Sequence, residues 1–439
     1  MNLIDRPKYL SQLKQWQTQD DLVKIVTGVR RCGKSKLFEL FQNYLKSTGV
    51  AGDQIININL EDDIQTKAIG LQLNKKTKLL DGYDLLLEYV VSRAVKNKKT
   101  YVFLDEIQML DTWQRAANTL RLRKDMDVYL TGSNAYMFSS DLHNEFGGRF
   151  IEIKMQPLSF KEYLSSAAKK MFFLQGEVLS AGEGHYINYT NNGGFPQTLA
   201  FDDNKEMIKS YLLDSVYNNT LQKDIVQRFG ISDPVRLHEV IKFMFDNISN
   251  PTSLLGIQRS LKANNIDIAP TTLNSYVKGL LDSYLMYKCV PYDVKGKRIL
   301  ESDAKYYACD IGLRAAILGR SDADVGRALE NIVYLELLQR GYTVSTGKVG
   351  IETIKVGDKT EHKKVEIDFV AQKAGGVVEY YQVAWTVLGD NTDTLDRELR
   401  PFEKIKDHYP KFLITMDPGN GMNNGIQRIN ALEWLIGQE

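Results

Sequence analysis

The chain has 439 residues, of which 43% are hydrophobic and 25% are charged, and its formal net charge is +1. This length predicts two or three domains, and the composition is that of a soluble globular protein. A net charge so close to zero means that the protein as a whole does not attract nucleic acid, so any nucleic-acid site must be a local basic patch.

The distribution of cysteines and apolar residues indicates a cytoplasmic protein. The three cysteines, Cys32, Cys289 and Cys309, are far apart and odd in number, which favours a reducing compartment over a disulfide framework or a zinc site. No stretch approaches the roughly 18 apolar residues of a membrane span, and the N-terminal segment is charged where a signal peptide needs an apolar run. We therefore expect no membrane partner.

The first predicted element is a short amphipathic helix over Asp5–Gln17, with Tyr9, Leu10, Leu13 and Trp16 on one face. Two functions for this helix stay open. It packs on a sheet, or part of it covers the base of a bound nucleotide.

The stretch Val23–Leu40 organises the rest of the chain. Its apolar residues up to Gly28 predict a buried strand, and the run from Lys34 onward predicts a helix. Between them, Gly28-x-x-x-x-Gly33-Lys34-Ser35 fits the phosphate-binding loop at every defined position. A glycine turn without a nucleotide is the alternative, and the flanking strand and helix disfavour it.

Each residue type in this loop has a mechanical purpose. Glycines let the backbone turn tightly, so that consecutive N–H groups point at the β- and γ-phosphates. Lys34 supplies a positive charge between those phosphates, and Ser35 supplies a hydroxyl for Mg²⁺ at a helix N-terminus. We therefore predict a site for ATP or ADP with Mg²⁺, formed by Gly28, Val29, Arg30, Arg31, Cys32, Gly33, Lys34, Ser35 and Lys36.

Two further strands follow, Gln54–Leu60 and Thr100–Gln108, and the second is apolar until Asp105 and Glu106. Adjacent acids at the carboxyl end of a buried parallel strand are costly unless they serve a cation or a water molecule. Beside a phosphate loop, we expect Asp105 to hold the Mg²⁺ shell and Glu106 to polarise the attacking water. A structural acid pair that caps the next helix is the alternative.

Polar residues mark the next two strands as well. Asp127–Ala135 predicts a strand whose end carries Ser133 and Asn134, either of which could sense the γ-phosphate, and the choice stays open. Arg149 comes directly before a fifth predicted strand. It could neutralise transition-state charge in cis, or in trans in an oligomer, and a plain surface arginine is the alternative.

Four segments of this part together resemble the AAA-type P-loop ATPases of prokaryotes. They are the phosphate loop, the strand with FLDE, the strand with TGS and the block from GR through PLSFKEYL. More narrowly, they resemble the group in which such an ATPase is fused to a C-terminal domain of uncharacterised function. The ATPase module of that group is similar to the signal-transducing switch ATPases. The resemblance implies an α/β fold: an AAA-like P-loop NTPase with a parallel sheet.

The same resemblance assigns a role to Gly194-Phe195-Pro196, which stands where switch ATPases carry a Gly-x-Pro turn. It implies that Pro196 packs near the adenine, although the turn could also simply start a helix. No clear second-sensor arginine follows, which departs from the standard lid and leaves ring formation open.

The middle of the chain has a winged-helix signature. Ser253–Asn265 and Pro270–Cys289 form a helix–turn–helix pattern, and the following segment predicts a hairpin with Gly296 at its tip. We expect Thr271 or Thr272 to cap the second helix. Its buried stripe is predicted to be Leu273, Val277, Leu280 and Leu281.

Duplex DNA and structural packing are both open as the purpose of this segment. Between Arg259 and Arg298 it contains seven basic residues and three acids, a local excess of +4 that is compatible with phosphate contacts. If DNA binds, Asn274, Ser275 and Lys278 would face a groove.

The C-terminal part predicts a helix within Arg327–Val344 that ends at Gly341, strands over Val365–Ala371 and Tyr380–Trp385, a helix over Thr394–Pro410 and a last strand over Lys411–Asp417. This order resembles the PD-(D/E)XK nuclease core.

The nuclease motif is only partly kept. Glu330 and Asp368 match its acids, but Gln382 and Ala384 stand where it has Glu-x-Lys. Loss of a positioned catalytic group costs on the order of 10²–10⁴ in rate, so we expect a scaffold rather than a cutting enzyme. Lys373 or Lys348 could replace the missing lysine.

These expectations combine into a nucleotide switch that acts on DNA or on a protein partner. Two alternatives stay open: a non-catalytic interaction scaffold that keeps its nucleotide, and an ATP-regulated nuclease. The predicted domains are an ATPase core (1–165), a helical lid (166–235), a winged helix (236–304) and an α/β nuclease-like domain (305–439).

Overall fold

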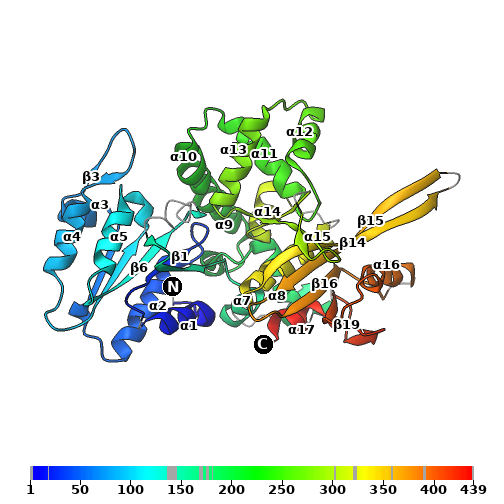
Figure 1. Ribbon diagram of the computed structural model, residues 1–439, viewed down its shortest axis with the longest axis horizontal. Helices are drawn as coiled ribbons and strands as arrows, with labels where there is room; N and C mark the ends of the chain where they lie inside the picture. Colours follow the sequence, from blue (N-terminus) through cyan, green and yellow to red (C-terminus); the bar gives the residue numbers. More distant parts are fainter. Residues whose placement is uncertain are drawn as a thin grey trace. The chain divides into compact units, whose positions relative to one another are not determined.

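The computed structural model describes residues 3–17, 19–135, 146–167, 172–174, 177–179, 181–300, 303–319, 324–356, 359–388 and 392–437. The chain divides into two compact units (Figure 1). The first comprises Met1–Pro157, Phe195–Ala200 and Asp282–Tyr284, and the second comprises the remaining residues. Within the described ranges, no helix has the length and apolar character needed to cross a membrane.

The first unit is built on a parallel five-stranded sheet with the order β2-β5-β6-β1-β7, as expected for the α/β prediction. All residues of β1, β5 and β6 are buried, which explains their nearly continuous apolar sequence. All five predicted strands are confirmed: β1 (Val23–Thr27), β2 (Ile55–Asn59), β5 (Thr100–Asp105), β6 (Met126–Gly132) and β7 (Phe150–Lys154).

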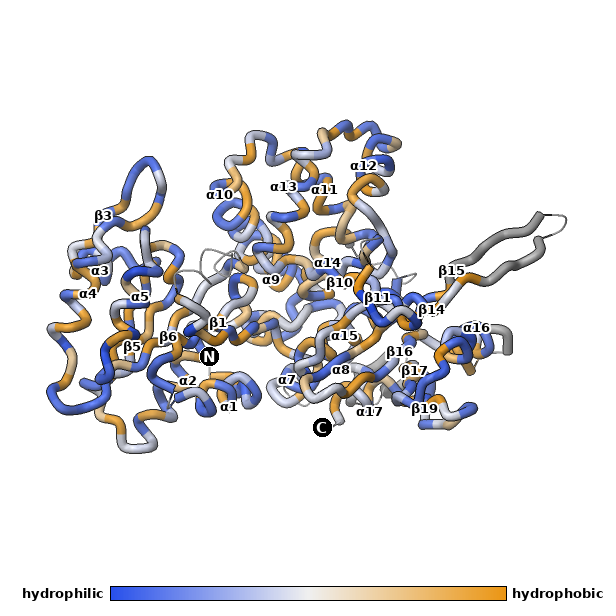
Figure 2. The backbone as a smooth tube through the Cα atoms, in the orientation of Figure 1, coloured by the Kyte–Doolittle hydropathy of each residue, from blue (hydrophilic) through white to orange (hydrophobic). Residues whose placement is uncertain are grey.

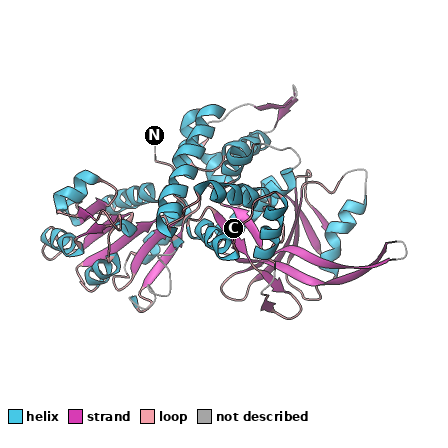
Figure 3. Cartoon of the chain, turned by 90° about the horizontal axis from the view of Figure 1, so that it is seen from above, coloured by secondary structure: helices cyan, strands magenta, loops and turns pink. Residues whose placement is uncertain are grey.

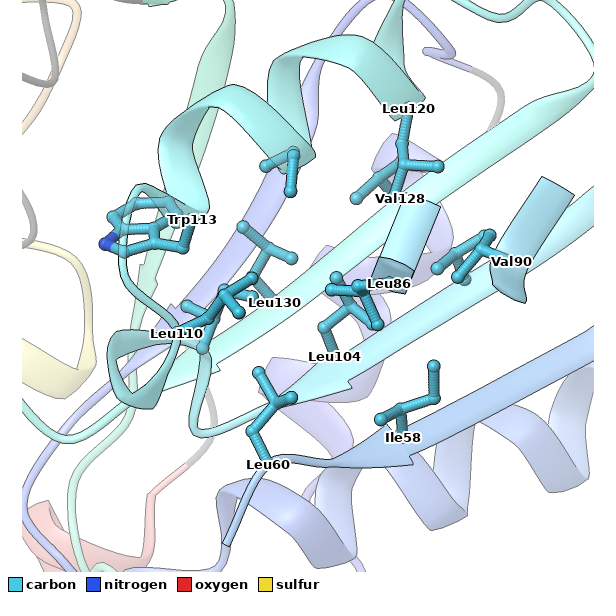
Figure 4. Packing of buried hydrophobic residues seen from close by; sticks show 14 of the residues in the cluster. Ile58, Leu60, Leu86, Val90, Leu104, Leu110, Trp113, Leu120, Val128 and Leu130 are labelled. Atoms are coloured by element: carbon cyan, nitrogen blue, oxygen red, sulfur yellow. The ribbon is translucent and has the colours of Figure 1, made fainter. Parts of the chain in front are cut away.

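Alternate residues of the central strands face two helical layers. Phe103 and Tyr129 point to one face, where the ring of Phe41 in α2 lies 5.1 Å from that of Tyr129. Leu104 and Leu130 belong to the opposite face, which α4 and α5 cover (Figure 4). The helices are α1 (Pro7–Trp16), α2 (Lys34–Ser47), α3 (Asp63–Ile69), α4 (Tyr83–Ser92) and α5 (Trp113–Arg121), with 3₁₀ turns η1 (Gly52–Gln54) and η2 (Ile107–Met109).

Hydropathy follows this layering. Apolar residues run along β1, β5 and β6, whereas the turn beyond β3 is hydrophilic (Figure 2). That turn joins the short antiparallel strands β3 (Gln72–Leu73) and β4 (Leu80–Asp81). Full burial of each apolar side chain in the core contributes roughly 1.5–3 kcal/mol.

One ion pair interrupts the apolar core between β1 and β6. Lys24 Nζ lies 2.6 Å from Asp127 Oδ1, and both side chains are 0% exposed. The Tyr129 hydroxyl donates to Asp127 Oδ2 at 2.7 Å, and Lys24 also donates to the Gln19 carbonyl at 2.6 Å. Sequence periodicity gave no sign of this pair, because Lys24 stands within an apolar run.

A segment far along the chain completes the first unit beside the phosphate loop. The Tyr284 hydroxyl donates to Glu152 Oε1 at 3.1 Å, and the same oxygen accepts from the Thr27 hydroxyl at 2.8 Å. Since Thr27 is the last residue of β1, this contact supports the strand end from which the loop starts.

The second unit begins with helices. They are α7 (Phe160–Ser166), α8 (Ala181–Asn192), α9 (Lys205–Ser210), the π-helices η5 (Tyr211–Asn218) and η6 (Thr220–Val226), α10 (Gln227–Phe229) and α11 (Pro234–Asp246). The strands β8 (Phe172–Leu174) and β9 (Glu177–Leu179) form a small hairpin, and the 3₁₀ segment η4 spans Pro196–Phe201.

Two helices form in the predicted helix–turn–helix segment, α12 (Leu254–Ala263) and α13 (Pro270–Asp282), but the second ends at Asp282, well before the predicted Cys289. The predicted cap is wrong, because α13 already begins at Pro270, a favoured first residue, and Thr271 and Thr272 lie inside its first turn. Leu281 is only half-buried. Strand β10 (Met286–Cys289) then pairs antiparallel with β13 (Lys305–Ala308), and Thr252 bridges to Ala304.

The predicted hairpin around Gly296 forms, but it does not stand alone. Its strands are β11 (Pro291–Asp293) and β12 (Arg298–Ile299). Strand β11 also runs parallel to β14, so the hairpin is the edge of the C-terminal sheet. A domain boundary after residue 304 therefore cuts through this sheet.

The C-terminal sheet has eight strands in the order β12-β11-β14-β15-β16-β17-β19-β18. Its further strands are β14 (Thr343–Val356), β15 (Lys359–Gln372), β16 (Val378–Ala384), β17 (Lys411–Thr415), β18 (Gly421–Asn423) and β19 (Ile426–Asn430). The accompanying helices are α14 (Ile311–Leu318), α15 (Val325–Gln339), α16 (Thr392–Glu403) and α17 (Ala431–Ile436). The outer halves of β14 and β15 extend as a two-stranded ribbon (Figure 3).

Two helix ends in this part differ from the sequence prediction, and one strand was not predicted. The first helix ends at Gln339, and Thr343 already starts β14, a strand that the sequence analysis missed. The second helix ends at Glu403 rather than at Pro410. Pro401 lies just before that end, and its missing N–H and bulky ring weaken the last helical turn.

Candidate active site

The loop between β1 and α2 has the geometry that its glycines permit. At Gly28, whose φ is +146°, an added Cβ would lie 2.0 Å from the carbonyl oxygen of Met155. Gly33, with a φ of +108°, precedes the first residue of α2. Any other residue would clash with Met155, directly after β7, at the first position and would strain the backbone at both.

Lys34 is bent back over this loop. Its Nζ donates to the carbonyls of Gly28 at 2.9 Å and Val29 at 3.2 Å, and it lies 3.8 Å from Glu106 Oε1. The residue is only 4% exposed. A bound phosphate would compete with these carbonyls for the same ammonium group.

Asp105 and Ser35 lie together at the end of β5. The Asp105 carboxylate accepts hydrogen bonds from the hydroxyls of Ser35 and Thr131. Burial raises the pKa of Asp105 above its ordinary value, and these hydrogen bonds oppose that effect. Two hard oxygen donors side by side fit Mg²⁺, which binds one or two protein oxygens and keeps its other positions for phosphate and water.

Glu106 is held in an unusual conformation. Its φ is +53°, in the left-handed region that non-glycine residues rarely adopt, at a typical cost of about 1–3 kcal/mol. Its backbone N–H donates to the Thr131 hydroxyl at 2.9 Å. Strain of this kind gathers at functional sites, where the surrounding contacts fix it.

Gln108 links Glu106 to one of the two candidate sensors. Its Nε2 donates to Glu106 Oε2 and, at 3.2 Å, to Ser133 Oγ. Its Oε1 is buried and has no hydrogen-bond partner within the described part of the chain. Ser133 is fully buried and Asn134 is 6% exposed. Sequence reasoning did not select Gln108 or Thr131, although each stands two positions from a residue that it did select, Glu106 and Ser133 respectively.

The arginines and the second lysine near the loop differ in their surroundings. Arg30 forms an ion pair with Glu61 at 3.0 Å, whereas Arg31 is exposed with a φ of +68°. Lys36 is exposed and pairs with Glu39 at 2.6 Å. Lys36 therefore points away from the residues that surround Lys34.

A buried arginine ties the N-terminal helix to the loop. Arg6, 3% exposed, donates to the carbonyls of Cys32 at 3.1 Å and Gln156 at 2.7 Å. Burial raises the pKa of the Cys32 thiol, so this cysteine stays neutral within the loop. The sequence analysis did not select Arg6.

Pro196 lies against the same loop. Its Cγ is 3.7 Å from the position that a Cβ on Gly33 would occupy, and Met155 Cε is 3.4 Å from that position. This placement is compatible with the expectation that Pro196 contacts the adenine.

Arg149 lies directly before the amino end of β7, whereas the phosphate loop follows the carboxyl end of β1. Its carbonyl accepts from the Val23 N–H at 3.1 Å, at the start of β1, and its side chain pairs with Asp21 at 3.6 Å. Four strand residues, about 13 Å, separate Val23 from the loop side of β1. This placement disfavours action of Arg149 in cis, and the choice between cis and trans stays a prediction.

Sequence comparison supports the same assignment of the fold. A family model described as "AAA domain" matches residues 20–164, and one described as "Domain of unknown function (DUF8612)" matches residues 183–324. An uncharacterised protein of Haemophilus influenzae is 34% identical over 435 residues, which are 99% of each chain. This chain belongs to the same family. A more distant relative, the uncharacterised protein MJ1544 of Methanocaldococcus jannaschii, is 28% identical over 88% of this chain and 79% of its own.

Solved structures resemble the family more remotely. The Walker-type ATPase PABY2304 of Pyrococcus abyssi has a TM-score of 0.40 and 15% identity, covering 72% of this chain and 95% of its own. Cdc6p of Pyrobaculum aerophilum has a TM-score of 0.30 and 13% identity, covering 72% and 93%. The AAA-type P-loop fold thus rests on the matching family model and on the sheet and loop described above.

Proposed function

We propose that this protein is an ATP-binding and ATP-hydrolysing switch. The observation that carries the proposal is the meeting of Lys34, Ser35, Asp105 and Glu106 at the carboxyl edge of one parallel sheet. Ligands of open α/β sheets bind at this edge. An AAA domain with this loop is an ATPase in its general activity.

The chain's own groups divide the work of hydrolysis. Lys34 leaves the loop carbonyls to bind the β- and γ-phosphates, and Ser35 and Asp105 would hold Mg²⁺, which supplies charge neutralisation when bound. Glu106 accepts the proton of the attacking water, and Gln108 fixes the direction of that carboxylate. An arginine of a neighbouring subunit, Arg149, adds positive charge in the transition state.

Nucleotide binding and turnover test this proposal in paired variants. Lys34→Ala should abolish binding of a fluorescent ATP analogue, and Glu106→Gln should bind ATP without turning it over. Lys46→Ala is the matched control, because Lys46 is an exposed lysine near the other end of the same helix, α2. Unimpaired turnover in purified Glu106→Gln would refute Glu106 as the base.

A nucleotide switch must pass its state to another part of the chain, and the turn before Pro196 offers a route to α14. The Asp310 carboxylate accepts from the Gly194 N–H at 2.6 Å and from the Leu313 N–H at 2.7 Å, at the start of α14. Movement of Pro196 with the nucleotide would pull on Gly194 through two peptide bonds. Asp310 would then transmit that pull to α14.

The helix–turn–helix is the second part of the proposal, as a winged helix that binds duplex DNA. The order of elements along the chain supports it: α11, the Thr252 bridge, α12, α13, β10 and β13. Asn274, Ser275 and Lys278 are exposed on α13, where a recognition helix presents its side chains. Replacing all three by alanine should weaken salt-dependent DNA affinity, and an unchanged affinity would rule out this surface.

A further inference from the structure

A buried ionic cluster lies in the α/β part of the second unit. Lys305 on β13 places its Nζ 2.8 Å from Glu330 Oε1 on α15 and 2.9 Å from Asp368 Oδ1 on β15. The three side chains are 8%, 13% and 14% exposed. Glu330 and Asp368 are the two acids that match the nuclease pattern, and the lysine that reaches them is neither Lys348 nor Lys373.

Both oxygens of Asp368 and one oxygen of Glu330 accept hydrogen bonds from protein donors. Asp368 Oδ2 accepts from the Val383 N–H at 3.0 Å, while its Oδ1 accepts from Lys305. Glu330 Oε1 accepts from Lys305 and also from the Tyr307 hydroxyl at 2.7 Å. The ammonium group therefore sits between the two carboxylates, where a divalent cation would have to lie.

Gln382 contributes no free oxygen either. Its Oε1 accepts from the Asp368 N–H at 3.2 Å, and its Nε2 donates to Glu398 at 2.8 Å. Because glutamine replaces the third acid of the nuclease pattern, a single ammonium faces two carboxylates rather than three. In the described ranges, no group of three or more histidines, cysteines or acids is placed to hold a metal. The residues do not fit a Mg²⁺ site.

Charge balance agrees with this geometry. Burial alone would lower the pKa of Lys305, but Asp368 and Glu330 outweigh it and raise that pKa above its usual value. Lys305 is thus a permanent cation. Breaking such a buried pair leaves an uncompensated charge, so both partners are needed together.

We propose that Lys305 is an internal counter-ion that takes the place of the divalent cation in this nuclease-like site. The site then neither binds Mg²⁺ nor cleaves phosphodiesters. It serves as an ionic joint that fastens β13, the partner of β10 beside the helix–turn–helix, to α15 and β15.

Mn²⁺ binding by the nucleotide-free full chain tests this proposal, with Mn²⁺ followed by electron paramagnetic resonance. The wild type and Asp368→Asn should both lack a saturable Mn²⁺ site. Lys305→Ala should gain such a site, since it exposes two carboxylates around a vacated position, and Lys305→Ala/Asp368→Asn should lose it again. Lys288→Ala is the matched control, because Lys288 is an exposed lysine on the neighbouring strand.

Each outcome decides the matter. Saturable Mn²⁺ binding in the wild type that disappears in Asp368→Asn overturns the proposal, and so does a folded Lys305→Ala that gains no site. If Lys305→Ala fails to fold, plasmid cleavage by the wild type in Mn²⁺ remains as the test. Cleavage abolished by Glu330→Gln contradicts the proposal, whereas no cleavage supports it.

Discussion

The ion pair between Lys24 and Asp127 leads to a quantitative prediction about the nucleotide-binding sheet. Burial lowers the pKa of Lys24 and raises that of Asp127, opposite to the effect of their mutual attraction. Desolvation therefore exceeds the attraction, although two charges 2.6 Å apart attract by about 6 kcal/mol at an effective dielectric constant of ~20. Asp127→Asn keeps the shape of the side chain but leaves Lys24 uncompensated, and should destabilise the unit by about 3–5 kcal/mol.

Urea unfolding followed by tryptophan fluorescence measures this loss. Trp16 and Trp113 lie in the first unit, so replacing Trp385 and Trp434 by phenylalanine makes the signal specific for it. The urea midpoint should then fall sharply in Asp127→Asn.

Two further variants serve as controls for that result. Asp125→Asn breaks the exposed pair with Arg123 and should change stability by less than about 1 kcal/mol. Replacing Lys24 by methionine and Asp127 by leucine together should restore most of the stability, because no buried charge remains. A loss below about 1 kcal/mol in Asp127→Asn would show that Lys24 finds other compensation and that the reasoning is wrong.

Three shorter predictions concern the site and its output. Gly28→Ala should abolish ATP-analogue binding while the chain stays folded by circular dichroism, because the new Cβ would overlap the Met155 carbonyl. Gln108→Ala should lower kcat by on the order of 100-fold with nucleotide affinity unchanged, because it removes the hydrogen bond that orients the Glu106 carboxylate. A loss of nucleotide affinity as large as the loss of kcat would contradict a positioning role. Burial raises the pKa of Asp310 from 3.8 to about 6. The protonated carboxyl therefore stabilises the fold fully below about pH 4, and this stabilisation is lost as the pH rises through about 6. The free energy of unfolding should accordingly change less between pH 4 and pH 7 in Asp310→Asn than in the wild type.

The sheet and loop of the first unit were predictable because their signals are local. A fully buried parallel strand is a continuous apolar run, and the phosphate loop lies within eight residues, Gly28–Ser35. The acids of β5 could be assigned because strand ends in a parallel sheet meet at one edge.

The contacts that sequence missed join residues that are far apart in the chain. Gln108 meets Ser133 across 25 positions, and Lys305 meets Asp368 across 63. No periodicity encodes such pairs, since tertiary packing alone brings them together. The edge position of β11 is similar, because a short hairpin carries no mark of the distant strand with which it pairs.

The way in which the chain passes between its two units limits how the protein can be taken apart. Residues 195–200 and 282–284 belong to the first unit although their neighbours on both sides belong to the second, so the backbone passes between the units five times. A fragment that stops at Pro157 would lack both Pro196 and Tyr284, which lie beside the two ends of the phosphate loop. The nucleotide-binding part is thus not a detachable module, and recombination with another ATPase would have to exchange three separated pieces of sequence at once.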